Sequence, residues 1–130
     1  MSNSIGPLGL SPWTYLAIGI FLEVVGTTCL KLSNGFTLPV PATLSVLCFL
    51  IALYTLSISV LAIPIGVVYA IWSGAGIVLI TIIGALYFGE LLAPIKLAFI
   101  AIILVGVVGL QIVSSEPGTP ATPDQHQGNS

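Results

Sequence analysis

The sequence predicts an all-α integral membrane protein, because of its composition and the length of its apolar segments. Of its 130 residues, 57% are hydrophobic and 5% are charged, and the mean hydropathy is +1.20. A chain with so few polar residues cannot cover a soluble core, so most of its surface must face lipid. Near-continuous apolar runs of about twenty residues favour helices over barrel strands, which are half that length and alternate in polarity.

Turn residues and the few charges divide the chain into four such segments. We expect four membrane-spanning helices, at residues 13–32, 40–62, 66–88 and 95–114. Residues 1–12 are predicted to be a flexible lead that is not a secretory signal, and 13–114 form the transmembrane domain. Residues 115–130, rich in Pro, Ser, Thr, Gln and Gly, are expected to be a disordered tail.

The sequence lacks the residues that several classes of protein function require. Cys29 and Cys48 lie inside predicted spans, where packing is their expected role, and His126 stands alone in the tail. There is no basic patch for nucleic acid, no glycine-rich phosphate loop and no nucleophile with a nearby base. We therefore predict a protein that is not an enzyme, binds no nucleic acid and has no metal site.

The charges at the ends of the predicted helices give only a weak orientation signal. Lys31 and Lys96 fall on the same side of the membrane, which tips that side toward the cytoplasm, and the chain has no Arg. Two lysines give only a small bias, so the sequence also allows a population of molecules in the inverted orientation. Both lysines are expected to reach the interface, and Glu90, at a predicted helix end, is expected to be solvated.

The stretch FLEVVGTTCLK places Glu23 about ten residues from either end of its span, roughly 15 Å from water along a helix. A carboxylate at that depth costs a few kcal/mol. One interpretation is a hydrogen-bonded group that joins helices, but an amide or a hydroxyl would do the same at lower cost. We favour a functional group for which a proton and an organic cation compete.

Small residues share the helix face of Glu23. Gly19, Ile20, Gly26 and Thr27 are three or four residues from it, the spacing of neighbours on one face. The glycines either leave room beside the carboxylate or allow close helix packing, and the spacing does not decide between them.

The third segment contains the stretch YAIWSGAGIV, which brings aromatic rings to one helix face. Tyr69, Trp72, Ser73 and Gly76 follow the same helical spacing. Ring faces attract positive charge, so aromatic side chains beside a carboxylate suit a hydrophobic cation. The alternative is an interfacial belt or simple packing.

At these residues the chain resembles a known family. The stretches LEVVGTTCLK, SNGF, IPIGVVYAIWSGAGIVLI and GVVG closely resemble the small multidrug resistance family of proton-coupled exporters, over residues 13 to 114. The resemblance implies a four-helix subunit of the bacterial inner membrane that works as an antiparallel, dual-topology dimer. Glu23 of both chains would form one shared site for protons and cationic substrates, with protons as the coupling ion and no other cofactor.

The resemblance also implies a branch and a set of site residues. Gly26 and the two threonines after it resemble the quaternary-ammonium and multidrug branch, whereas the guanidinium-exporting branch typically has Trp at that position. Around the central Glu23, substrate contacts would come from Trp13, Tyr15, Gly19, Ile20, Thr27, Tyr69, Trp72 and Ser73. Packing or conformational roles would fall to Gly74, Gly76, Gly106 and Gly109.

Three positions depart from the family pattern. Phe99 stands where a glycine usually leads the dimerisation stripe, Phe49 stands where a tyrosine is expected, and Leu91 and an acidic tail replace basic residues. Besides the homodimer, a paralogous partner subunit of opposite orientation therefore stays open. So do guanidinium, polyamine or lipid substrates, and an accessory role in a larger membrane complex.

Overall fold

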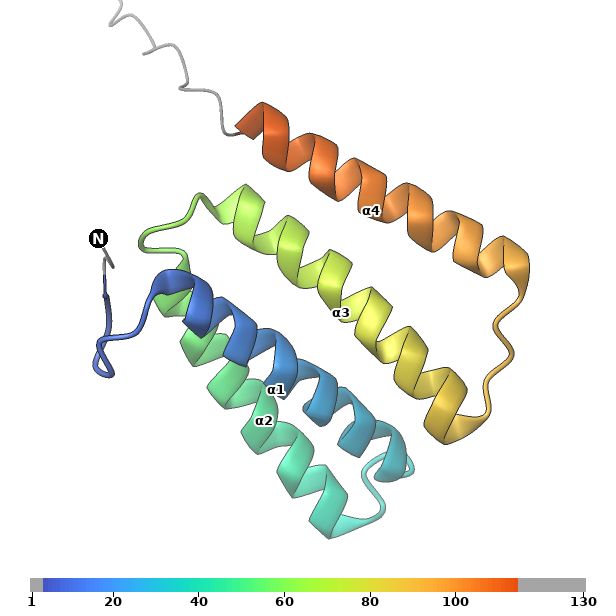
Figure 1. Ribbon diagram of the computed structural model, residues 1–130. Helices are drawn as coiled ribbons and strands as arrows, with labels where there is room; N and C mark the ends of the chain where they lie inside the picture. The colour runs from blue at the N-terminus through green and yellow to red at the C-terminus, as the bar shows by residue number, and fades with distance from the viewer. Residues whose placement is uncertain (1–3, 115–130) are drawn as a thin grey trace, which may run out of the picture.

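The computed structural model describes residues 4–114, which form four α-helices joined by short connections (Figure 1). The helices are α1 (Pro12–Leu32), α2 (Pro39–Ser59), α3 (Ile65–Phe88) and α4 (Pro94–Ser114). All four are long and apolar enough to cross a membrane. The predicted all-α architecture with four spans is confirmed. The predicted tail at 115–130 lies outside the described residues, as do residues 1–3.

Proline and glycine set most of the helix ends. α1, α2 and α4 each begin at a proline, whose missing N–H is not needed in the first turn. α3 ends at Phe88 and is followed by Gly89, which adopts the left-handed conformation with φ +65° that commonly terminates helices. The sequence predicted that the second helix would run to residue 62, but α2 ends at Ser59. The helix stops short of Pro64, because a proline disfavours helical geometry at the residue that precedes it.

α1 packs most closely on α2 and also contacts α3, whereas α4 lies on the outer side of α3 (Figure 1). A buried cluster joins α1 to the start of α3 and the turn before it; its members are Leu16, Ile20, Ile63, Val67 and Val68. No residue in the apolar stretch of α4 is buried. The exposed surface of α4 is therefore left for lipid or for another protein chain.

Two glycines allow the backbones of α1 and α2 to approach closely. A Cβ at Gly26 would lie 3.1 Å from the Cβ of Cys48 and 3.4 Å from the carbonyl oxygen of Ser45. A Cβ at Gly19 would lie only 2.7 Å from the Oγ1 of Thr55, which itself donates to the carbonyl of Ala52. These contacts favour the packing interpretation of both glycines, because a membrane offers little hydrophobic driving force between helices and close contact must replace it.

We predict that Gly19→Ala destabilises the fold by about 1–3 kcal/mol, since the added methyl group would lie 2.7 Å from Thr55 Oγ1 on α2 and 3.1 Å from the ring of Trp72 on α3, and both must move. Gly66→Ala is the matched control, because a Cβ there meets no atom within 4 Å. Reversible unfolding in mixed detergent, followed by circular dichroism, measures both variants. Equal stability of the two would contradict the close α1–α2 contact.

Candidate functional site

A cavity of about 330 Å³ lies between α1 and α3, around the middle of α1. The residues that line it are Glu23, Val24 and Thr27 from α1, and Tyr69, Trp72, Ser73, Gly76, Ile77 and Ile80 from α3. The structure thus brings together five of the residues expected at a substrate site, and Gly76 with them. The members from α3 follow helical spacing throughout, so one face of that helix forms a continuous wall.

Glu23 presents its carboxyl group to this cavity. Trp72 lines the cavity together with Glu23, whose Oε2 is buried and finds no hydrogen-bond partner among residues 4–114. The absent side chain of Gly76 leaves space beside it, because a Cβ there would lie 3.5 Å from Oε2. A buried carboxyl oxygen without a partner is costly. A carboxyl that served only to join helices would have both oxygens bonded, so this geometry favours a site for a ligand.

Tyr69 and Ser73 form the next turn of the wall. The hydroxyl of Ser73 donates to the carbonyl of Tyr69 at 2.6 Å, which leaves the serine oxygen as an acceptor toward the cavity. The ring of Tyr69 is 71% exposed, so it borders the opening rather than the floor. With Trp72 it gives the cavity two aromatic surfaces beside one carboxyl.

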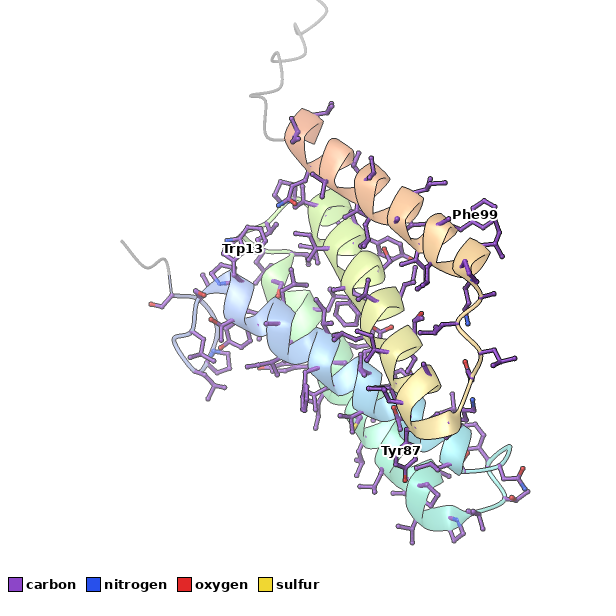
Figure 2. All side chains as sticks on the ribbon, turned by 45° about the vertical axis from the view of Figure 1, so that its right-hand side comes forward. Trp13, Tyr87 and Phe99 are labelled. Carbon is purple, nitrogen blue, oxygen red and sulfur yellow. The ribbon has the colours of Figure 1, made fainter. Side chains whose placement is uncertain are left out.

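Four residues expected to contact substrate do not line this cavity. Trp13 lies at the start of α1 and is half-exposed (Figure 2). Tyr15 is buried, and its hydroxyl accepts from the backbone N–H of Leu8. Gly19 lies between Thr55 of α2 and the ring of Trp72, and Ile20 belongs to the buried cluster. Helical spacing groups Gly19 and Ile20 with Glu23, but the apolar face of α1 is wide and is divided between α2 and α3. Their contacts with substrate stay predictions.

The apolar members of the wall were not predicted from the sequence. Val24 follows Glu23 directly, and Ile77 and Ile80 continue the spacing of Tyr69, Trp72, Ser73 and Gly76 by one further turn. That periodicity was a usable signal for the two isoleucines. Val24 could not be recognised in this way, because an adjacent residue points about 100° away around an ideal helix.

A second cavity of about 170 Å³ lies at the ends of α1 and α3, near the start of α4. It is lined by Thr27, Thr28, Lys31, Ile80, Thr81, Gly84, Phe88, Glu90 and Lys96. Lys31 forms an ion pair with Glu90, and its Nζ lies 4.1 Å from the centroid of the Phe88 ring. Sequence reasoning expected both charges at solvated helix ends but missed their pairing, because 59 residues separate them and no local pattern connects them.

The sequence of the described elements matches a known family. The family model for Small Multidrug Resistance protein matches residues 11–103, which include α1 to α3, both cavities and about half of α4. The chain belongs to the small multidrug resistance family. The resemblance noted in the sequence is therefore confirmed.

Curated members of the small multidrug resistance family cover most of this chain. Multidrug transporter PA4990 of Pseudomonas aeruginosa is 41% identical over 109 residues, which are 84% of this chain and 99% of the relative. Quaternary ammonium compound-resistance protein QacE of Escherichia coli is 41% identical over 102 residues, 78% of this chain and 93% of the relative. Multidrug transporter EmrE of Escherichia coli K12 is 36% identical over 105 residues, 81% of this chain and 96% of the relative.

Membership of the small multidrug resistance family and the four candidate spans place the chain in the bacterial inner membrane as a multi-pass protein. The named relatives are transporters or resistance proteins, which agrees with the prediction that the chain is not an enzyme. These relatives carry the names of the quaternary-ammonium and multidrug branch, which the Gly-Thr-Thr stretch after Glu23 resembles.

We predict that the carboxyl of Glu90 titrates abnormally. The hydrogen bond and charge of Lys31, aided by the charge of Lys96, hold the pKa of Glu90 below its usual range. Because the pKa of Glu90 is lower in the folded protein, the pair stabilises the fold at pH values above the ordinary pKa of a carboxyl. That contribution is lost as the pH falls through the lowered pKa. Carbon-13 NMR of labelled glutamate measures the titration, with Glu90→Gln to assign the signal. Lys31→Gln should return the pKa of Glu90 toward its ordinary value, and an unchanged titration would contradict the pairing.

Proposed function

We propose that the protein is a proton-coupled antiporter that exports hydrophobic aromatic or quaternary ammonium cations. The observation that carries this proposal is the carboxyl of Glu23 in the cavity between α1 and α3, where one buried oxygen has no hydrogen-bond partner among residues 4–114 and Trp72 lines the same cavity. The quaternary ammonium resistance of relatives such as QacE supports the same class of substrate.

Competition for Glu23 supplies the coupling. An ionised carboxylate among apolar side chains is unfavourable until a positive charge or a proton neutralises it. A proton bonds to the oxygen directly, whereas an organic cation pairs with the carboxylate and rests against the faces of Trp72 and Tyr69. Because each neutralises the same negative charge, the arrival of one favours the departure of the other. Exchange across the membrane follows when the cavity opens to alternate sides.

A second copy of the chain completes the proposed site. α1 and α3 supply one wall, and a copy inserted in the opposite orientation would supply a second, related to the first as an inverted repeat. The orientation bias from the two lysines is small, so it is compatible with both orientations. Gly106 and Gly109 are available for the contact, because a Cβ at either would meet no atom of the described residues within 4 Å. The two Glu23 carboxyls would then titrate as a coupled pair.

A paralogous partner is the second candidate assembly. Phe99 is 59% exposed, and its ring projects away from the other helices in Figure 2. A large ring at the start of α4 limits how closely an identical helix can approach, which small residues would otherwise permit. Co-purification of two differently tagged copies of this chain tests the homodimer, and its failure would favour the paralogue.

We expect an aromatic cation to displace protons from wild-type protein. Tetraphenylphosphonium added to purified protein in weakly buffered detergent near neutral pH should release protons, because cation and proton share Glu23. Glu23→Gln should abolish the release and weaken binding by roughly tenfold or more, since the charge partner is lost. Glu116→Gln, the same change in the tail, should keep both. Binding by the wild type without proton release would contradict the competition.

We also expect the space beside Glu23 to limit binding. Gly76→Val would place methyl groups against Oε2, so tetraphenylphosphonium affinity should fall by about tenfold. Gly66→Val is the matched control, because it makes the same exchange in α3 and a Cβ there meets no atom of the described residues within 4 Å. Isothermal titration calorimetry compares the two variants. Equal affinities would place the bound cation elsewhere.

A further inference from the structure

The ammonium group of Lys31 lies in surroundings that would suit a foreign cation. The carboxylate of Glu90 pairs with it, and the face of the Phe88 ring lies 4.1 Å from its Nζ. An aromatic face together with an anion is the combination by which proteins bind quaternary ammonium groups. Phe88 and Glu90 come from the end of α3 and the residues after it. Of these three interacting side chains, Lys31 is the one that α1 supplies.

The backbone after α3 fixes the carboxylate in place. Gly89 is left-handed, and the N–H of Glu90 donates to the carbonyl of Gly84 at 2.9 Å, which turns the chain back over the last turn of α3. The carboxylate then lies against Gly84, where a Cβ would come within 2.7 Å of Oε2. Gly84 therefore makes room for the carboxylate on the side of α3 that faces α1. The backbone of Glu90 is therefore held by α3, and its carboxylate lies between Gly84 and Lys31.

This carboxylate lines the smaller of two neighbouring cavities. Thr27 and Ile80 line both cavities, and Thr28 and Thr81 add hydroxyl groups to the smaller one. Lys31 follows Glu23 by eight residues, a separation of about 12 Å along an ideal helix. The two carboxylates therefore lie one after the other along α1, with Glu23 deep in the membrane and Glu90 near its surface.

We propose that Phe88 and Glu90 form a second binding site for organic ammonium cations, in which Lys31 is a tethered competitor of the incoming ligand. The side chains of Lys31 and Glu90 are 47% and 42% exposed, and exposed ion pairs contribute little net stability. An arriving cation can therefore replace the lysine, whose long side chain then reaches water. Lys96 faces the same carboxylate from α4 and also contributes positive charge. A role of this site in transport rests on the proposed function, whereas cation binding there does not.

The test uses the full-length Glu23→Gln protein, which removes the deeper carboxylate, and benzyltrimethylammonium as the probe. Binding is followed by NMR of the labelled Phe and Glu side chains in non-ionic detergent. Lys31→Gln should tighten binding about fivefold to tenfold by removing the competitor. Glu90→Gln should abolish the response of the Phe88 ring signals, and Phe88→Leu should weaken binding about fivefold while keeping an apolar side chain.

Lys96→Gln is the matched control, because it removes the same charge from the same cavity without emptying the place above the Phe88 ring. It should change the affinity less than about twofold if direct competition, and not the general field, controls binding. The proposal is overturned if Lys31→Gln leaves the affinity unchanged, or if Lys96→Gln matches it. The binding measurement at Glu90 is made on the Glu23→Gln protein, so it does not depend on antiport. Absence of proton release from the wild type would count against antiport at Glu23 and not against the second site.

Discussion

The carboxylate of Glu23 in an apolar helix is the constraint on which the rest of the structure depends. Such a group is tolerated only where it faces a cavity or a partner, so α1 must be held in one rotational position. The contact with α2 provides this, because Gly19 and Gly26 let the two backbones meet and Thr55 lies against the first of them. With that side of α1 occupied, Glu23 is directed to α3, and Gly76 keeps the space beside its Oε2 free.

The four helices have unequal roles as a result. α1 and α2 form the closest pair, α3 supplies the aromatic wall, and α4 is attached to the outer side of α3 (Figure 1). Gly74 makes that attachment close, since a Cβ there would lie 3.3 Å from the side chain of Val107. The predicted packing role of Gly74 thus agrees with a contact inside one chain, whereas Gly106 and Gly109 lie on the uncovered surface of α4. The proposed dimer needs such a surface.

Much of this arrangement could be predicted from sequence, for reasons that particular residues illustrate. Apolar length located all four helices, and helical spacing grouped Tyr69, Trp72 and Ser73 correctly on the wall. Spacing could not divide the broad apolar face of α1 between two neighbours, so it grouped Ile20 with Glu23 although Ile20 belongs to the buried cluster. The pair of Lys31 with Glu90 was beyond sequence reasoning, because it depends on how the chain turns after α3.

The two carboxylates differ in the property that decides what each can do. Glu90 is half-exposed and already paired, so water and Lys31 both reduce what a ligand gains by binding there, and exchange should be fast. Glu23 has a buried oxygen that finds no hydrogen-bond partner in the described part of the chain, and a cation or a proton that reaches it relieves a larger desolvation cost. In the proposed transporter, a cation would thus meet a weak site near the surface before a strong one at depth. In that proposal, proton coupling belongs to the deep site, because Oε2 of Glu23 has no hydrogen-bond partner among residues 4–114 whereas Glu90 is already paired with Lys31.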